Sequence, residues 1–304
     1  MKFELYIDAK DEYAVQFRDI LEADEVVSKK LDPYIRRVDK VSLENDMDII
    51  QRLVELGHKH HTGYRIELVS NFTKKELSSC KLYTIFGTKF ISQDDMSINK
   101  MLDYSRELGK LSEAKPFGFR RLDYKKYYLK KAKTLKEESF AVCSGSGSQF
   151  FFGNYIADLM HNAGITGWSR CPVIHPVTQE KLEGLHLLGV SHELPEMIKD
   201  NKYLTTSEWG YSLDTLLMFE QRKLDNTELK DLNITQENLT GDGSGLCCVS
   251  KSFYDFYKKH NLKGLKFRPV LLKGSELYGL YIEKREYLES LFSGVPELVV
   301  TERY

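Results

Sequence analysis

The side chains best able to do chemistry in this sequence are dispersed histidines, acids and thiols. His175, His186, Asp242 and Cys247 could act as base, acid and nucleophile if a fold brought them within hydrogen-bond distance. Their spacing matches no catalytic motif: there is no Gly-x-Ser-x-Gly elbow, no P-loop and no dinucleotide-binding glycine pattern. The sequence therefore keeps an enzyme with a site of dispersed residues as an alternative. It predicts no catalytic and no cofactor-binding residue.

Metal binding has two candidate patterns, and both are incomplete. The histidine-rich run at residues 58–61 lacks a visible third ligand, and a structural metal site needs several converging ligands, so we expect a surface loop there. The five cysteines are an odd number without a Cys-x-x-Cys pair, which favours reduced, mostly buried thiols. We predict no metal site.

A basic, tyrosine-rich run occupies residues 120–136, with eight Lys and Arg residues and one acid. Tyr124, Lys125 and Tyr128 combine aromatic faces for stacking on bases with a cation for phosphates, so a single-stranded nucleic-acid binder is a second alternative. The balance of 44 Lys and Arg against 45 Asp and Glu in the chain counts against it. A solvated helix or edge strand, or a surface for a protein partner, fits the run better.

Trp168 and Arg170 are two residues apart and would share one face of a strand. Tryptophan and arginine are the side chains most often found at interface hot spots. Together with the three residues of the basic run, they form the predicted partner-binding set.

The elements that position these residues follow from periodicity. Residues 2–8 and 64–68 alternate like half-buried strands, residues 43–57 show helical spacing, and Thr73 with Glu76 has capping-box form. This mixture predicts an α+β protein with mixed or antiparallel sheets. We place a domain boundary at residue 139, which gives an N-terminal domain of residues 1–139 and a C-terminal domain of residues 140–304.

One sequence pattern occurs twice in the C-terminal domain, at residues 154–188 and 253–282, with an insertion near residues 194–239 between the two passages. Each passage has a helix-like stretch, His-Asn, a glycine five residues before Pro-Val, and a later Leu-x-Gly-Leu. The pattern predicts a helix–turn–strand–strand unit, with a strand at Leu277–Ile282 in the second passage. Internal duplication and convergent turn chemistry both remain open.

Three stretches resemble uncharacterised bacterial proteins of polymorphic-toxin and immunity loci, over about two-thirds of the chain. These stretches are residues 162–188, residues 72–77 and residues 249–270. Some relatives carry paired Cys-x-x-Cys-Gly motifs that suggest a zinc ribbon, and this chain has none, so that site does not transfer. The resemblance implies a bacterial protein without transferable catalytic residues, whose partner is a cognate toxin.

The expected function is non-enzymatic binding of the immunity type, in which the protein covers a toxin's active site. Charge and shape complementarity suffice for that role. The start of the chain lacks the apolar core of a signal peptide, and no stretch approaches a membrane span, so we expect a cytoplasmic location with no membrane partner.

Overall fold

A computed structural model describes the chain at residues 1–10, 14–32, 34, 37–92, 127–129, 134–143, 149–175, 177–200, 202–207, 210–237, 239 and 245–303. Helices and strands both recur along the chain, and the strands form mixed and antiparallel sheets. The predicted α+β class is confirmed.

Two compact units make up the chain, and their borders differ from the boundary predicted at residue 139. Unit 1 comprises Met1–Ser79, Leu213–Leu216 and Leu271–Tyr304, and unit 2 comprises Cys80–Ser212 and Leu217–Val270. The difference arises because the C-terminal segment returns to the N-terminal sheet through main-chain pairing. Periodicity carries no signal for such a long-range pairing.

Unit 1 is built on a sheet with the strand order β18-β3-β1-β2. The strands are β1 (Lys2–Ala9), β2 (Val38–Ser42), β3 (Tyr64–Asn71) and β18 (Leu298–Glu302). β1 pairs antiparallel with β2 and β3, whereas β18 pairs parallel with β3. Burial alternates along β1 and β3, so the sheet has one core face and one outward face, as the alternation in the sequence predicts.

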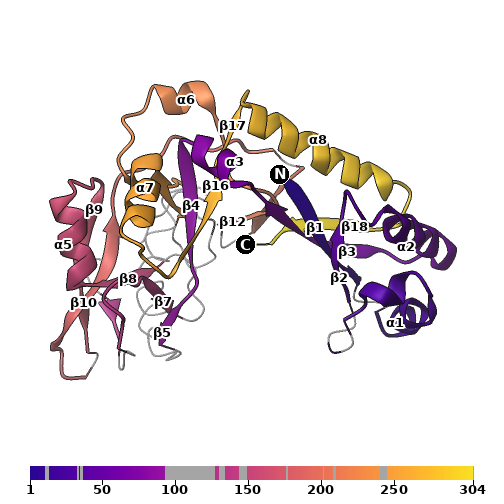
Figure 1. Ribbon diagram of the computed structural model, residues 1–304, viewed down its shortest axis with the longest axis horizontal. Helices are drawn as coiled ribbons and strands as arrows, with labels where there is room; N and C mark the ends of the chain where they lie inside the picture. Colours follow the sequence, from indigo (N-terminus) through magenta and orange to yellow (C-terminus); the bar gives the residue numbers. More distant parts are fainter. Residues whose placement is uncertain are drawn as a thin grey trace. The chain divides into compact units, whose positions relative to one another are not determined.

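Helices cover the core face of this sheet. Figure 1 shows α2 and α8 along one side of it. Phe3 of β1 packs edge-on against Tyr281 of α8, and Tyr64 of β3 donates a hydrogen bond to the Leu53 carbonyl of α2. The helices of unit 1 are α1 (Ala14–Ala23), η1 (Val27–Lys30), α2 (Met47–His60), α3 (Lys74–Ser79) and α8 (Glu276–Leu291).

The predicted capping box is confirmed at the start of α3. The Glu76 carboxylate accepts from the Thr73 main-chain N–H at 2.7 Å, and the Glu76 N–H donates to the Thr73 hydroxyl at 3.2 Å. The run at residues 58–61 ends α2, where His61 takes a left-handed conformation. These histidines close a helix instead of forming the predicted surface loop.

The strand predicted at Leu277–Ile282 is wrong, because these residues lie in α8. Ser275 caps the helix by accepting from the Tyr278 N–H at 3.2 Å, and Glu276 adds a favourable charge in the first turn. The predicted repeat therefore stops before its second Leu-x-Gly-Leu.

Unit 2 is built mainly on two larger sheets, and β11 (Leu204–Ser207) and β12 (Gly210–Leu213) form a separate two-stranded pair. The six-stranded sheet has the order β5-β7-β8-β10-β9-β6, and the four-stranded sheet has the order β14-β15-β4-β16. The strands are β4 (Leu82–Gly87), β5 (Phe90–Ser92), β6 (Tyr127–Tyr128), β7 (Ala141–Cys143), β8 (Phe150–Gly153), β9 (Trp168–Ile174), β10 (Lys181–Val190), β14 (Leu232–Ile234), β15 (Cys247–Ser250) and β16 (Leu265–Pro269). Two helices follow β8 and β15 directly: α5 (Asn154–Asn162) and α7 (Lys251–Lys259).

The remaining elements of this part of the chain lie between β10 and β14 in the sequence or follow β16. The predicted insertion near residues 194–239 contains β11 (Leu204–Ser207), β12 (Gly210–Leu213), β13 (Met218–Glu220) and α6 (Gln221–Asp225). Its last strand, β14, is an integral strand of the four-stranded sheet. β17 (Leu271–Lys273) follows β16.

The two sheets repeat one arrangement. We call β7, β8, α5, β9 and β10 the α5 module, and β14, β15, α7, β16 and β4 the α7 module. In each module a strand runs straight into a helix, and the chain then returns as a strand of the same sheet. A central antiparallel strand separates the two. The central strand of the α5 module, β10, directly follows β9 in the chain, whereas the central strand of the α7 module, β4, precedes the whole α5 module.

The correspondence extends to single hydrogen bonds. β8 and β15 begin at residues 150 and 247, a difference of 97, and the same difference links the bonds that end the helices. Ile165 N donates to Met160 O, and Leu262 N donates to Tyr257 O. The left-handed residues after the helices are Gly164 and Asn261, so the two His-Asn pairs that the sequence suggests as equivalent do not correspond.

The modules also hold each other reciprocally. Leu232 N, at the start of β14, donates to Thr166 O of the α5 module at 3.1 Å. Phe140 N, before β7, donates to Lys263 O of the α7 module at 2.8 Å. Convergent turn chemistry explains a similar turn, but not matching strand registers and reciprocal bonds. The arrangement favours internal duplication.

Among the described residues, no helix combines the length and apolar character needed to cross a membrane.

Candidate functional site

Polar side chains gather where α5 meets β9 and β10, and we call Asn154, Tyr155, Asp158, Arg170 and His186 the α5 corner. Arg170 of β9 donates to the Asp158 carboxylate of α5 at 2.8 Å, and both side chains are exposed. His186 Nε2 lies 2.7 Å from Asn154 Oδ1 at the start of α5. Tyr155 is 44% exposed, a large aromatic surface to leave in water.

The electrostatics of the corner centre on His186. Partial burial against Phe152 and the nearby positive charge of Arg170 lower the pKa of His186, while Asp158 and Glu183 oppose that shift. His186 is therefore mostly neutral at pH 7 and can accept or donate one hydrogen bond. Arg170 is the permanent cation of the corner.

Trp168 lies two residues before Arg170 on β9 and is half-buried. Its ring packs edge-on against Phe152 with centroids 5.9 Å apart, and its Nε1 donates to the Ile165 carbonyl at 2.8 Å. Trp168 is thus tied into the module, and Arg170 is the outward member of the predicted pair. Their role in partner binding stays a prediction.

The equivalent corner of the α7 module has a different character. Position for position, Phe267 replaces Arg170 and Tyr83 replaces His186. Tyr83 stacks on Tyr254 with centroids 4.6 Å apart, and Phe267 packs edge-on against Tyr254 at 5.1 Å and against Tyr257 at 4.8 Å. Aromatic side chains thus take the places of Arg170 and His186, while the helix keeps an exposed acid, Asp255, paired with Lys251.

The basic run is only partly described. Tyr124 and Lys125 lie outside the described residues. Tyr128 belongs to β6, the edge strand beside β9, where it pairs with Ile174. The two described residues of β6 thus adopt an edge strand, one of the forms predicted for the run.

The dispersed residues of the enzyme alternative have separate surroundings where the structure describes them. His175 Nδ1 lies 3.1 Å from the Thr178 main-chain nitrogen in the turn between β9 and β10, whereas His186 contacts Asn154. Cys247 is buried in β15, and Asp242 lies outside the described residues.

In the described part of the chain, the thiols and the other potential metal ligands do not form a metal site. The cysteines at positions 80, 171, 247 and 248 are buried, as predicted, and burial raises the pKa of the Cys248 thiol. No group of three or more His, Cys, Asp or Glu side chains there is arranged to hold a metal ion.

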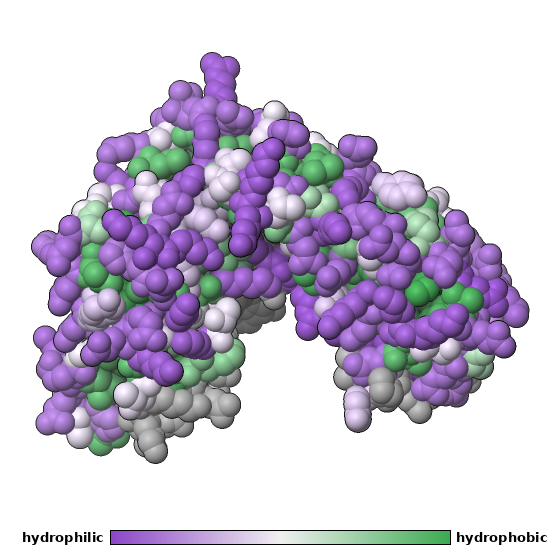
Figure 2. Space-filling model, viewed as in Figure 1, coloured by the Kyte–Doolittle hydropathy of each residue, from purple (hydrophilic) through white to green (hydrophobic). Residues whose placement is uncertain are grey.

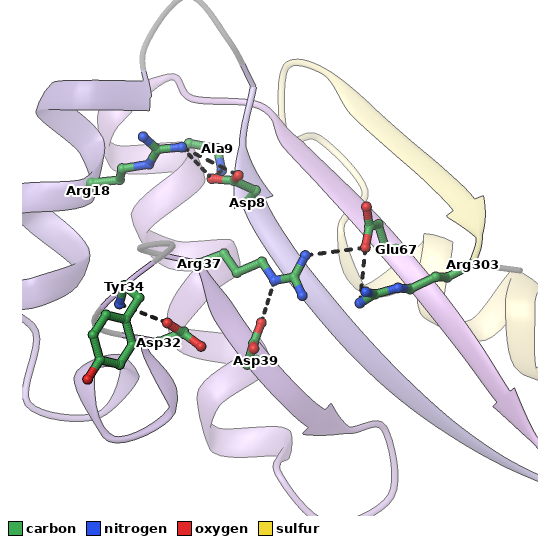
Figure 3. A network of polar contacts seen from close by, with 9 residues as sticks. All are labelled: Asp8, Ala9, Arg18, Asp32, Tyr34, Arg37, Asp39, Glu67 and Arg303. Carbon is green, nitrogen blue, oxygen red and sulfur yellow. Dashed lines mark hydrogen bonds and ion pairs between the residues drawn. The ribbon is translucent and has the colours of Figure 1, made fainter. Parts of the chain in front are cut away.

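A second polar network, which sequence reasoning missed, lies on the outward face of the unit 1 sheet (Figure 3). Arg37 and Arg303 each approach the Glu67 carboxylate at 3.4 Å, and each guanidinium lies 4.8 Å from the centre of the Tyr6 ring. The alternation of Arg65 and Glu67 on β3 signals an outward face. The contact with Arg303, however, depends on the parallel pairing of β18 with β3.

The exterior in view is mostly hydrophilic, and its apolar residues form small separate patches (Figure 2). Both candidate surfaces, the α5 corner and the outward sheet face, combine arginine and tyrosine with acids. Such surfaces suit contact with a protein partner.

No model of a known protein family matches this chain, and no curated protein matches it either. The resemblance to proteins of toxin and immunity loci therefore stays a prediction.

Proposed function

We propose that this protein binds a protein partner through the α5 corner and acts as an immunity protein, neutralising a cognate toxin by covering its active site. The observation that carries the proposal is the difference between the modules. One scaffold occurs twice, and both copies carry an exposed acid on the helix, Asp158 or Asp255. Only the α5 copy adds an exposed cation, Arg170, at the return-strand position where the α7 copy has Phe267, and an exposed tyrosine, Tyr155, on the helix.

Stability does not explain the polar corner. An exposed ion pair such as Arg170–Asp158 contributes about 0.2–1 kcal/mol. The α7 module builds the same fold with an aromatic side chain, Phe267, at the position of Arg170. Side chains that the scaffold does not require are therefore candidates for recognition.

The chemistry of the corner suits occlusion. Arg170 has guanidinium N–H groups left for a partner's carboxylate or carbonyl oxygens, since the bond to Asp158 uses one nitrogen. Tyr155, one helical turn before Asp158 on α5, offers apolar area and a hydroxyl. Two such anchors suffice for a hot spot when the partner excludes water around them.

The test is co-expression with the product of the adjacent gene in the native locus. We expect a stoichiometric complex by size-exclusion chromatography and survival of host cells that would otherwise be poisoned. Arg170→Ala and Tyr155→Ala should each weaken binding at least about tenfold in calorimetry, equivalent to about 1.4 kcal/mol.

The matched control is Lys251→Ala in the α7 module. It removes an exposed ion pair, Lys251–Asp255, from the equivalent helix and should leave affinity unchanged. If no complex forms with the neighbouring product, the immunity role is wrong. If a complex forms and tolerates both corner variants, partner binding lies elsewhere on the chain.

A further inference from the structure

The outward face of the unit 1 sheet presents an unusual balance of charge. We call it the Tyr6 face, and it consists of outward-facing side chains of the sheet with the arginines bonded to them. Its members are Lys2, Glu4, Tyr6, Asp8, Arg18, Arg37, Asp39, Arg65, Glu67 and Arg303. Five are basic and four are acidic.

Tyr6 forms the centre of this face. Its strand neighbour Glu67 lies directly opposite on β3, and the guanidiniums of Arg37 and Arg303 lie over its ring. Figure 3 shows Arg37 and Arg303 converging on Glu67 and Arg18 reaching toward Asp8. Three of these contacts, Arg37–Glu67, Arg303–Glu67 and Arg18–Asp8, measure 3.4 Å, at the long end for hydrogen bonds.

Loose internal pairing leaves hydrogen-bonding capacity. Among the described residues, Arg37 donates from Nε to Asp39 at 2.5 Å and from one Nη to Glu67. A guanidinium has five N–H groups, so three of those on Arg37 remain for another acceptor. Carboxylates of a facing surface would complete them.

The rest of unit 1 is acidic, which restricts what can approach the Tyr6 face. Unit 1 holds 17 Lys and Arg residues against 23 Asp and Glu, and the chain totals of 44 and 45 leave 27 and 22 for unit 2. Outside the Tyr6 face, unit 1 has 12 basic and 19 acidic residues. The acidic remainder repels polyanions and acidic proteins, and it draws basic proteins toward the helices instead of the sheet.

A second copy of this chain fits these constraints. A twofold interface places one patch against itself, so it needs both signs of charge on the same patch. The Tyr6 face supplies both signs, with an aromatic ring at its centre. We infer that two copies of the chain associate through the Tyr6 face, with arginines of each copy bonded to acids of the other.

The size of the face sets the expected strength. Two strands of 8 residues and two of 5, at about 3.3 Å per residue and about 4.8 Å apart, cover roughly 400 Å² per copy. Stable interfaces bury about 800 Å² per partner, so the pairing should be weak and reversible, with a dissociation constant on the order of 10 μM or higher.

Sedimentation velocity of the full-length protein, from low to several hundred micromolar, tests the inference. We expect a monomer–dimer equilibrium that shifts toward monomer as salt is raised. Arg303→Glu should raise the dissociation constant at least about tenfold, because it places like charges across the interface.

Thr301→Arg is the second variant. It adds a bulky cation opposite Glu67 on β18 and removes none of the contacts named above, so folding should survive. Lys59→Glu is the control, since it makes the same charge change as Arg303→Glu at an exposed position of α2. It should leave the equilibrium unchanged.

Three outcomes overturn the inference. These are a monomer at every concentration, a dimer that tolerates both face variants, and open-ended assemblies in place of a closed dimer. None of them bears on toxin binding by the α5 corner, so the two proposals fail independently.

Discussion

The α5 and α7 modules share their strand registers and helix ends, and both carry an exposed acid on the helix, yet they place different side chains at the equivalent strand positions. The α5 module exposes Arg170 and Asp158, joined by an ion pair, and keeps His186 against Asn154. The α7 module closes the same place with Tyr83, Tyr254 and Phe267, which pack ring against ring.

This difference separates what the fold requires from what it tolerates. Features present in both modules, such as a strand leading into a helix and a glycine at the turn before the return strand, belong to the scaffold. Charges present in one module alone do not. An internal repeat thus acts as its own control for assigning function to surface residues.

The central strand β4 and two reciprocal main-chain bonds tie the two modules together. The α5 module is continuous in sequence from β7 to β10, whereas the α7 module takes its central strand β4 from before the α5 module, and Leu232 N and Phe140 N each donate to the other module. Damage to one turn should therefore destabilise both sheets together.

The turn glycines should show the largest effect. Gly264 has φ 91° and Gly167 has φ 82°, and a Cβ atom at either would collide with a main-chain carbonyl oxygen, that of Phe140 or of Leu232. We expect Gly264→Ala and Gly167→Ala each to lower the free energy of unfolding by roughly 3 kcal/mol, measured by urea denaturation.

Gly164→Ala distinguishes the cost of a positive φ angle from the cost of a steric clash between the new Cβ atom and the facing module. Gly164 has φ 68°, and no atom lies within 4 Å of the place that an alanine Cβ would take, so its substitution should cost only about 1 kcal/mol. Equal losses for all three variants would mean that the close approach between the modules contributes nothing.

The corner residues should differ between the modules. Phe267→Ala removes edge contacts with Tyr254 and Tyr257 and should cost about 2 kcal/mol. Arg170→Ala, at the equivalent position, should change stability by less than about 0.5 kcal/mol. Thermal and urea unfolding of both variants measure the contrast.

A large loss for Arg170→Ala would break the comparison. It would mean that the α5 corner holds the fold together, as the aromatic corner does, and it would weaken the case for recognition. If Phe267→Ala hardly lowered the free energy of unfolding, the aromatic packing at the α7 corner would also contribute little to stability.

Local features of this fold could be predicted from sequence. Alternation along β1 and β3, the capping box of Thr73 and Glu76, and the helix-like stretch of the second repeated passage all rest on contacts within a few residues. The first repeated passage could also be predicted in outline, because its helix, turn and two strands are consecutive.

Features that depend on distant pairing could not be predicted. The pattern favours a strand at Leu277–Ile282, since Leu-x-Gly-Leu repeats an earlier strand, but the Ser275 cap begins a helix there. The candidate site shows the same limit. Trp168 and Arg170 lie two residues apart on one strand as predicted, yet Asp158 and His186 join Arg170 only through the packing of α5 and the pairing of β10.

The smallest predicted effect is a difference in pH dependence between the two corners. Folding lowers the pKa of His186, chiefly by burial and then by the charge of Arg170, so the unfolded chain binds the proton more readily. The stability that neutral His186 contributes is complete above the unfolded pKa of about 6.5 and is lost as pH falls through the lower folded value.

Between pH 7 and pH 5 the parent should lose about 0.5 kcal/mol more than His186→Gln, a small amount because the ring is partly exposed. Tyr83→Phe, the matched change in the α7 module, should follow the parent, because burial moves the pKa of Tyr83 upward, away from this range. Urea unfolding at both pH values measures these differences. If the free energy of unfolding changes with pH identically in the parent and in His186→Gln, the His186 ring is fully hydrated at the α5 corner. The charge of Arg170 would then be the remaining difference between the modules.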